Sequence, residues 1–219
     1  MNNWSIEIKD FDEEYKSRGN YHYTLTGFEK WWFERNYKLL CESISPDDKV
    51  LDLGCGDGVL ADFCKSKNIC GIDISEAGVN IAKSMGKYQS LYVQDISNFD
   101  IVEDDFDAVV CSLTFWYLNK EQLKSSIGCI KNVLRIGGKL NFSFKNIDKN
   151  QNTWLIEYLE SEGFKIQSFI GISFRMPHFL FKISNGPFWP ISYIYYILST
   201  SSRFFPNRSY HFVVKATLN

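Results

Sequence analysis

The stretch VLDLGCGDGVL, residues 50–60, joins a short apolar run to three glycines and two aspartates. An apolar run of this length bounded by glycine is typical of a buried strand. Glycine costs roughly 0.5–1 kcal/mol relative to alanine inside a regular element, so its repeated use here indicates a turn that needs bare backbone. The pattern is neither GxxxxGK[ST] nor a complete GxGxxG, and two carboxylates would repel a pyrophosphate. The turn therefore favours a cationic or neutral ligand.

Strands and helices alternate along the chain on the C-terminal side of this turn. The strands are mostly continuous apolar runs, which indicates a parallel sheet covered on both faces. We expect an α/β, doubly wound, Rossmann-like fold with a mostly parallel seven-stranded sheet, an N-terminal helix and an aromatic-rich insertion before the last strand. The predicted strands are 49–53, 69–73, 90–95, 106–113, 138–144, 164–172 and 209–218. The predicted helices are 27–45, 57–67, 76–86, 120–135 and 152–163.

The length of 219 residues favours a single domain. Within it we expect an N-terminal helical cap (1–47), a ligand-binding core (48–171), an insertion (172–208) and a last strand (209–219). The six cysteines form no CxxC pair and show no zinc-like spacing, so we expect no metal site and a reduced, cytoplasmic protein. The polar, acidic N-terminus is not typical of a signal peptide, and no apolar segment is long enough to span a bilayer.

Charge is unevenly distributed along the chain. Residues 1–162 carry a net charge of −8, whereas residues 163–219 carry +6 and no acidic side chain. The basic residues are few and scattered rather than arranged as a stripe, which argues against a nucleic-acid partner. The insertion contains ten aromatic residues together with four basic ones.

Two further carboxylates follow the next two predicted strands. Asp73 ends the strand ICGID and is placed to accept hydrogen bonds from a ribose diol. Asp95 ends the strand SLYVQD, where its carboxylate could accept from an exocyclic amine while Ile96 covers an adenine face. Because parallel strands end at one edge of a sheet, Asp52, Asp73 and Asp95 are expected around one crevice.

This set of segments resembles the class I S-adenosylmethionine-dependent methyltransferases, in the order and spacing of that family. The resemblance extends from about residue 48 to 145. The matching segments are VLDLGCGDG (50–58), GIDIS (71–75), VQDI (93–96), FDAVVCSL (106–113) and VLRIGGKL (133–140).

The resemblance implies S-adenosylmethionine as cofactor. It implies that Gly54 and Gly56 lie under the methionine portion, that Asp73 holds the ribose, and that Asp52 supports the loop or the ligand's amino group. The residues implied to bind the cofactor are Asp52, Gly54, Cys55, Gly56, Gly58, Asp73, Ile74, Asp95, Ile96, Cys111 and Ser112.

The catalytic residues are less defined. Related small-molecule enzymes often carry Glu-His after the fourth strand, but this chain has Trp116 and Tyr117 there, so no role of that histidine is carried over. Tyr117, His22 and His178 are candidates for contacting or deprotonating the acceptor, although a surface or packing role is favoured for the two histidines.

Two other features have a structural explanation beside a functional one. Cys55 could be a nucleophile, but no histidine neighbours it, and a packing role is favoured. The pair Trp31 and Trp32 is explained by core packing at least as well as by a substrate platform.

Two functions stay open. The first is methyl transfer to an oxygen or nitrogen atom of a small-molecule, lipid-like or glycan-linked acceptor. The second is a non-catalytic module that binds S-adenosylmethionine as a regulatory or partner subunit. The insertion could be a hydrophobic lid, a pocket for an apolar anionic acceptor, or a peripheral contact with an anionic membrane. The pattern does not indicate the oligomeric state.

Overall fold

The computed structural model describes residues 8–102, 104–145, 149–173 and 209–219. Its elements are, in order, α1 (Ile8–Arg18), η1 (Tyr21–Thr24), α2 (Gly27–Cys41), β1 (Val50–Leu53), η2 (Val59–Asp62), β2 (Ile69–Asp73), α3 (Glu76–Met85), β3 (Ser90–Val93), β4 (Phe106–Ser112), η3 (Phe115–Tyr117), α4 (Lys120–Val133), β5 (Leu134–Lys145), α5 (Lys149–Ser161), β6 (Phe164–Ser173) and β7 (His211–Leu218). The elements labelled η are 3-10 helices.

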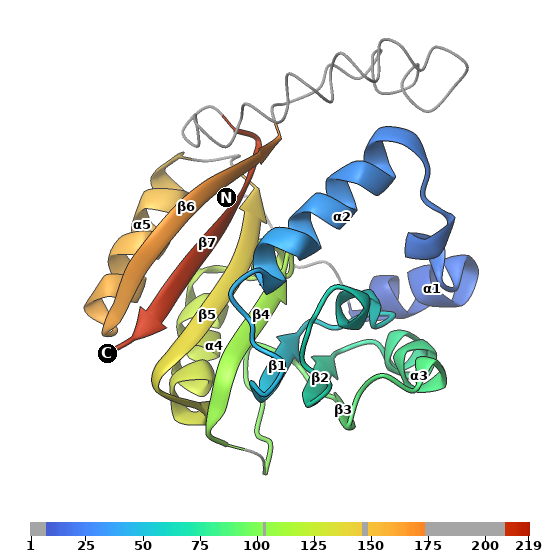
Figure 1. Ribbon diagram of the computed structural model, residues 1–219, viewed down its shortest axis with the longest axis horizontal. Coiled ribbons are helices and arrows are strands. Elements are labelled where there is room, and N and C mark those ends of the chain that lie inside the picture. The colour runs from blue at the N-terminus through green and yellow to red at the C-terminus, as the bar shows by residue number, and fades with distance from the viewer. Residues whose placement is uncertain (1–7, 103, 146–148, 174–208) are drawn as a thin grey trace.

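The strands form one seven-stranded sheet in the order β3-β2-β1-β4-β5-β7-β6 (Figure 1). Strands β1 to β5 pair in parallel, whereas β7 runs antiparallel to both β5 and β6. The predicted mostly parallel α/β sheet is therefore confirmed, with an antiparallel edge. The strand order reverses beside β1, and open sheets bind ligands at the carboxyl ends of the strands where this happens.

Helices cover both faces of the sheet. Figure 1 shows α2 crossing one face, while α4 and α5 lie behind the other. On the α4 and α5 side, the core includes Phe106, Leu140 and Phe142, all fully buried. On the α2 side, Leu40 packs with Val110, and both are fully buried as well. Burial on both faces explains why the strands read as continuous apolar runs.

Local sequence explains where two helices begin. At α4, the Asn119 side chain accepts a hydrogen bond from the Gln122 backbone, and the Gln122 side chain accepts one from the Asn119 backbone. At α3, the Ser75 hydroxyl accepts from the Gly78 backbone. Such caps satisfy amides that have no partner within the helix.

Two predictions about local structure were wrong. The helix expected over 57–67 is only the short 3-10 helix η2, because the chain must return at once to start β2. Helix α1 was not predicted over its own residues because its composition is largely polar and charged, with Ile8, Phe11 and Tyr15 as its apolar positions. Its position therefore depends on tertiary contacts.

The insertion predicted at 172–208 lies, from residue 174 onward, outside the described residues. Its proposed lid, pocket or membrane roles stay predictions, as does the division of the chain into cap, core and insertion. Within the described ranges, no helix combines the length and apolar character needed to cross a membrane.

Candidate functional site at the carboxyl edge of the sheet

The glycine turn leaves β1 and is tied to the neighbouring strand by its backbone. The amides of Gly54 and Cys55 donate to the Ile72 carbonyl at 2.8 and 2.9 Å. Gly54 and Gly56 have φ angles of +82° and +50°, which lie in the left-handed region that favours glycine. The backbone conformation therefore explains why glycine stands at these positions.

Protein side chains also approach these two glycines. A β-carbon at Gly54 would lie 2.3 Å from the Thr114 hydroxyl, and one at Gly56 would lie 2.0 Å from the Tyr15 hydroxyl. The expected approach of a ligand to this bare backbone stays a prediction. The glycines also admit one side chain from the loop after β4 and one from α1.

Asp73 ends β2 and faces the glycine turn. Its two carboxylate oxygens accept hydrogen bonds from the backbone amides of Gly56 (2.8 Å) and Ser75 (2.9 Å). The side chain is 9% exposed, and burial raises its pKa. Each carboxylate oxygen has a second lone pair, so Asp73 can hold the turn and still accept from ribose hydroxyls.

Asp95 lies two residues beyond β3 and is exposed. One of its oxygens accepts from the Ser97 amide at 2.8 Å. Ile96 is buried in the core cluster on the α4 side, whereas Ile74 is half-buried. The Asp95 carboxylate is thus available to an amine, while Ile96 mainly contacts the core.

Asp52 does not lie at the strand tip. It points from β1 into the α2 side of the sheet, is 1% exposed, and accepts a 2.6 Å hydrogen bond from the Tyr88 hydroxyl. Burial raises its pKa to about 7, although the Tyr88 hydrogen bond opposes this shift. The expectation that all three carboxylates surround the crevice is corrected, because Asp52 lies beneath the turn.

His22 supports the turn from η1. Its Nδ1 lies 2.7 and 2.8 Å from the two carboxylate oxygens of Asp57, which is fully buried. This contact explains His22 as a residue that positions the loop. The other histidine candidate, His178, lies outside the described residues.

Helix α1 lies beside α3 (Figure 1). The Asp12 carboxylate accepts from the Ser75 hydroxyl (3.0 Å) and the Ala77 amide (2.8 Å) at the start of α3. On the other side, the ring of Phe11 packs edge-on against Tyr117 after β4, with centroids 4.9 Å apart. The helix therefore bridges the loops that follow β2 and β4.

The end of β4 carries a polar cluster. Cys111 is fully buried, and the Ser112 hydroxyl accepts from the Asn36 side chain of α2 at 2.8 Å. Leu113 has φ +59° and donates its amide to the Ser143 hydroxyl at 3.0 Å. A left-handed conformation at a leucine is strained, and such strain is concentrated at functional sites.

Sequence reasoning missed two ionisable residues beyond this point. Lys145 ends β5 with its ammonium 4.4 Å from the centre of the Trp116 ring. His211, directly opposite Lys145 on β7, lies 4.5 Å from the Trp32 ring, and burial lowers its pKa to about 3. Nothing in the sequence singles out either residue. Because the two are far apart in the chain, no local pattern indicates that they lie opposite each other.

The surroundings of the other candidate residues favour some of their predicted roles over others. Tyr117 is half-buried at the crevice, and burial raises its pKa, so it is a hydrogen-bond donor rather than a base at neutral pH. Cys55 is buried, and burial raises the pKa of its thiol, which fits packing rather than nucleophilic attack. Trp32 is 9% exposed and packs in the α2-side cluster.

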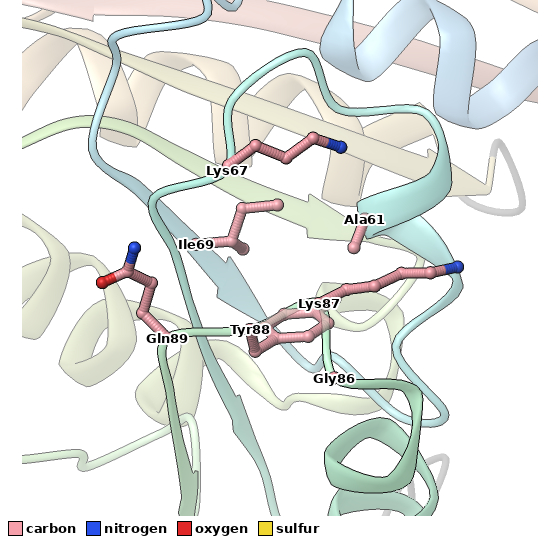
Figure 2. Close-up of a pocket in the computed structure, with 7 residues that line it drawn as sticks. All are labelled: Ala61, Lys67, Ile69, Gly86, Lys87, Tyr88 and Gln89. Atoms are coloured by element: carbon pink, nitrogen blue, oxygen red, sulfur yellow. The ribbon is translucent and has the colours of Figure 1, made fainter.

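A cavity of about 460 Å³ lies elsewhere in the fold. Figure 2 shows its lining, in which Lys67 and Lys87 extend in the same general direction on either side of Ala61. Residues 67–69 and 86–89 precede or begin strands β2 and β3. The cavity is therefore at the amino ends of these strands, and its lining residue Tyr88 also lies next to Gly58 of the turn.

Comparisons with known proteins agree with the fold and the turn. A family model described as a methyltransferase domain matches residues 50–138. The chain is 31% identical over 140 residues to carboxy-S-adenosyl-L-methionine synthase from Campylobacter fetus, covering 58% of this chain and 59% of that protein. It is 26% identical over 123 residues to a ubiquinone biosynthesis O-methyltransferase from Idiomarina loihiensis, covering 52% and 48%. The chain thus spans about half to three fifths of the length of these curated relatives.

A solved structure extends the likeness to the whole fold. Magnesium protoporphyrin IX methyltransferase from Synechocystis, solved with bound S-adenosylmethionine, superposes with a TM-score of 0.62 at 17% identity, covering 100% of both chains. The sheet order, the glycine turn and these matches together show a class I methyltransferase fold, with a methyltransferase-domain match over residues 50–138.

Proposed function

We propose that the chain binds S-adenosylmethionine beneath α1 and transfers its methyl group to an oxygen or nitrogen atom of a small-molecule acceptor. The observation that carries this proposal is Asp73, held beside the glycine turn with acceptor capacity left on both oxygens. Asp95, exposed beyond the next strand, supplies a second carboxylate at the same edge.

The described residues fit the cofactor. A ribose diol needs an acceptor at the end of β2, which Asp73 provides, and an exocyclic amine needs one beyond β3, which Asp95 provides. The cofactor, when bound, supplies a methyl group on a positively charged sulfur that accepts the electron pair as the acceptor atom attacks. A carboxylate at Asp73 suits this cation, and a nearby positive charge would oppose the rise in its pKa that burial causes.

The chain's task in such a transfer is positioning. The acceptor atom must be held in line with the methyl group at roughly 3–3.5 Å, and water must be excluded. Helix α1, which bridges the loops after β2 and β4, is placed to exclude water. A general base is needed only for an acceptor that holds its proton at neutral pH.

Titration calorimetry and thermal unfolding with S-adenosylmethionine test the proposal. At a ligand concentration of 100 times Kd, binding stabilises the native state by about 2.7 kcal/mol, which raises the Tm of a domain of this size by about 5–10 °C. The absence of both heat and a Tm shift would refute cofactor binding. Binding without turnover on carboxylate, phosphate, glycan and lipid acceptors would favour the non-catalytic alternative.

Replacing Tyr15 by alanine is expected to weaken cofactor binding up to about tenfold and to speed dissociation, because α1 loses its contact with Gly56 and Gly78. Tyr15→Phe keeps the ring and should give a smaller effect. Stopped-flow measurement of dissociation checks both variants. Tyr158→Ala on α5, at the opposite face of the sheet, is the matched control, and equal effects of Tyr15→Ala and Tyr158→Ala would contradict the role of α1.

A lipid-like acceptor and peripheral membrane contact rest on the sequence of the insertion alone. Vesicle co-sedimentation with and without anionic lipid tests them. Equal and negligible binding to both kinds of vesicle would exclude the membrane role.

A further inference from the structure

A cluster of polar residues lies between α2, the ends of β4 and β5, and the start of β7. Its members are Trp32, Asn36, Ser112, Ser143, Lys145 and His211. Its members share the α2 face of the sheet, because Lys145 and His211 are directly opposite each other and Ser112 is paired with Ser143. Ser143 and Lys145 are two residues apart on β5, so they face the same side at a separation of roughly 7 Å. The cluster therefore adjoins the β4 loop, where the family resemblance puts the sulfonium.

Among the buried polar atoms of α2 that have no hydrogen-bond partner within the described ranges, two belong to this cluster. They are Oδ1 of Asn36, whose residue is fully buried, and Nε1 of Trp32, whose residue is 9% exposed. A buried polar group without a partner costs about 1–3 kcal/mol, so each such group calls for an explanation. Asn36 is fixed at this place because its amide group donates to the Ser112 hydroxyl.

Lys145 also has an unmatched polar group, its ammonium, within the described part of the chain. Among the described residues no carboxylate lies within ion-pair distance of its ammonium, which rests over the Trp116 ring instead. Neighbouring His211 is neutral, because its pKa is held far below its ordinary value by burial and by the charge of Lys145. A half-buried ammonium with no counter-ion attracts an anionic ligand more strongly than an exposed one, since screening by water is reduced.

We propose that these residues form the acceptor site and that the methyl acceptor is a small molecule carrying an anionic group, a carboxylate or a phosphate, together with a hydroxyl or amine. Lys145 binds the anion. Asn36 Oδ1 accepts a hydrogen bond from the hydroxyl or amine, and Trp32 Nε1 donates one to the acceptor. This assignment rests on the proposed function, because it places the acceptor beside the cofactor.

The cluster also limits the size of the acceptor. Ser112, next to the predicted methyl group, is paired with Ser143. Ser143 lies roughly 7 Å along β5 from Lys145, so the two ends of the cluster are only slightly farther apart than that. An acceptor whose nucleophilic atom and anionic group lie on one ring or one short chain would reach both ends. The site is therefore suited to a compact metabolite.

Anion binding to the complex with S-adenosylhomocysteine tests the proposal, with sodium benzoate and inorganic phosphate as separate probes. We expect one of the two to bind by calorimetry, and Lys145→Met to weaken that binding at least tenfold. Lys165→Met, at an exposed lysine at the start of β6, makes the same charge change and should stay within twofold of the wild type. Preference for benzoate indicates a carboxylate acceptor, and preference for phosphate indicates a phosphorylated one.

Intrinsic fluorescence locates the binding. The anion should change the tryptophan emission, and Trp116→Phe, which keeps an aromatic ring beneath the Lys145 ammonium, should reduce that change. Equal anion affinity in Lys145→Met and wild type, or no anion binding to a protein that binds S-adenosylhomocysteine, would overturn the acceptor assignment alone. A wild-type chain that does not bind S-adenosylhomocysteine would instead refute the proposed function, and the assignment with it.

Discussion

The Asp73→Ala variant is expected to bind S-adenosylmethionine about 5- to 150-fold more weakly than the wild type, a loss of roughly 1–3 kcal/mol. The substitution removes the carboxylate predicted to accept from the ribose hydroxyls. It also releases the amides of Gly56 and Ser75, so the glycine turn loses one of its hydrogen bonds to β2. Titration calorimetry on protein shown to be folded by circular dichroism measures the change.

Two further variants separate charge from position in this experiment. Asp47→Ala makes the same charge change at an exposed residue before β1, at the opposite edge of the sheet, and should leave affinity within twofold. Asp73→Asn keeps the size of the side chain but replaces one acceptor by a donor that faces a backbone amide. Unchanged affinity in Asp73→Ala would contradict the assignment of the ribose site.

The Asp52→Asn variant is expected to change how stability depends on pH. Burial raises the pKa of Asp52 to about 7 from an ordinary value of 3.8, so the folded state binds its proton more tightly than the unfolded state. Between these two values the folded chain holds more protons, and the free energy of unfolding contributed by Asp52 falls as pH rises. At about 1.36 kcal/mol per pH unit, the loss is on the order of 4 kcal/mol by pH 7.

Asparagine keeps an oxygen that can accept from the Tyr88 hydroxyl but carries no charge, so it removes this loss. The difference in unfolding free energy between Asp52→Asn and wild type should therefore rise in favour of the variant from pH 4 to pH 7. Urea unfolding under reducing conditions measures it across this range. Asp100→Asn, at an exposed position, should follow the wild-type curve. A difference that is constant with pH would show that Asp52 is not buried as a neutral acid.

The parts of the fold that sequence reasoning predicted are those fixed by local pattern. Apolar runs four to seven residues long located the central strands, and the glycines at 54 and 56 located the turn, because positive φ angles leave little choice of residue. Asp73 was correctly predicted at the end of its strand, since strand ends are marked by the same pattern.

The errors concern residues whose neighbours lie far away in the chain. Asp52 reads as a strand-end carboxylate, but Tyr88, 36 residues later, holds it beneath the turn. Helix α1 has too few apolar residues to be predicted from its own sequence, and it is positioned by Asp12 and Tyr15 against loops more than 40 residues away. No local sequence pattern indicates contacts between residues so far apart in the chain.

The sequence by itself determined an α/β sheet with a glycine turn and carboxylates after its first strands, because period, apolar content and backbone conformation are local properties of the chain. Tertiary structure alone decided which carboxylate is buried and that α1 bridges the loops after β2 and β4. It also decided that Asn36 of α2 contacts Ser112 of β4 and that Lys145 lies opposite His211. These outcomes depend on the pairing of distant segments, above all the antiparallel return of β7 beside β5, which brings His211 opposite Lys145 across 65 intervening residues.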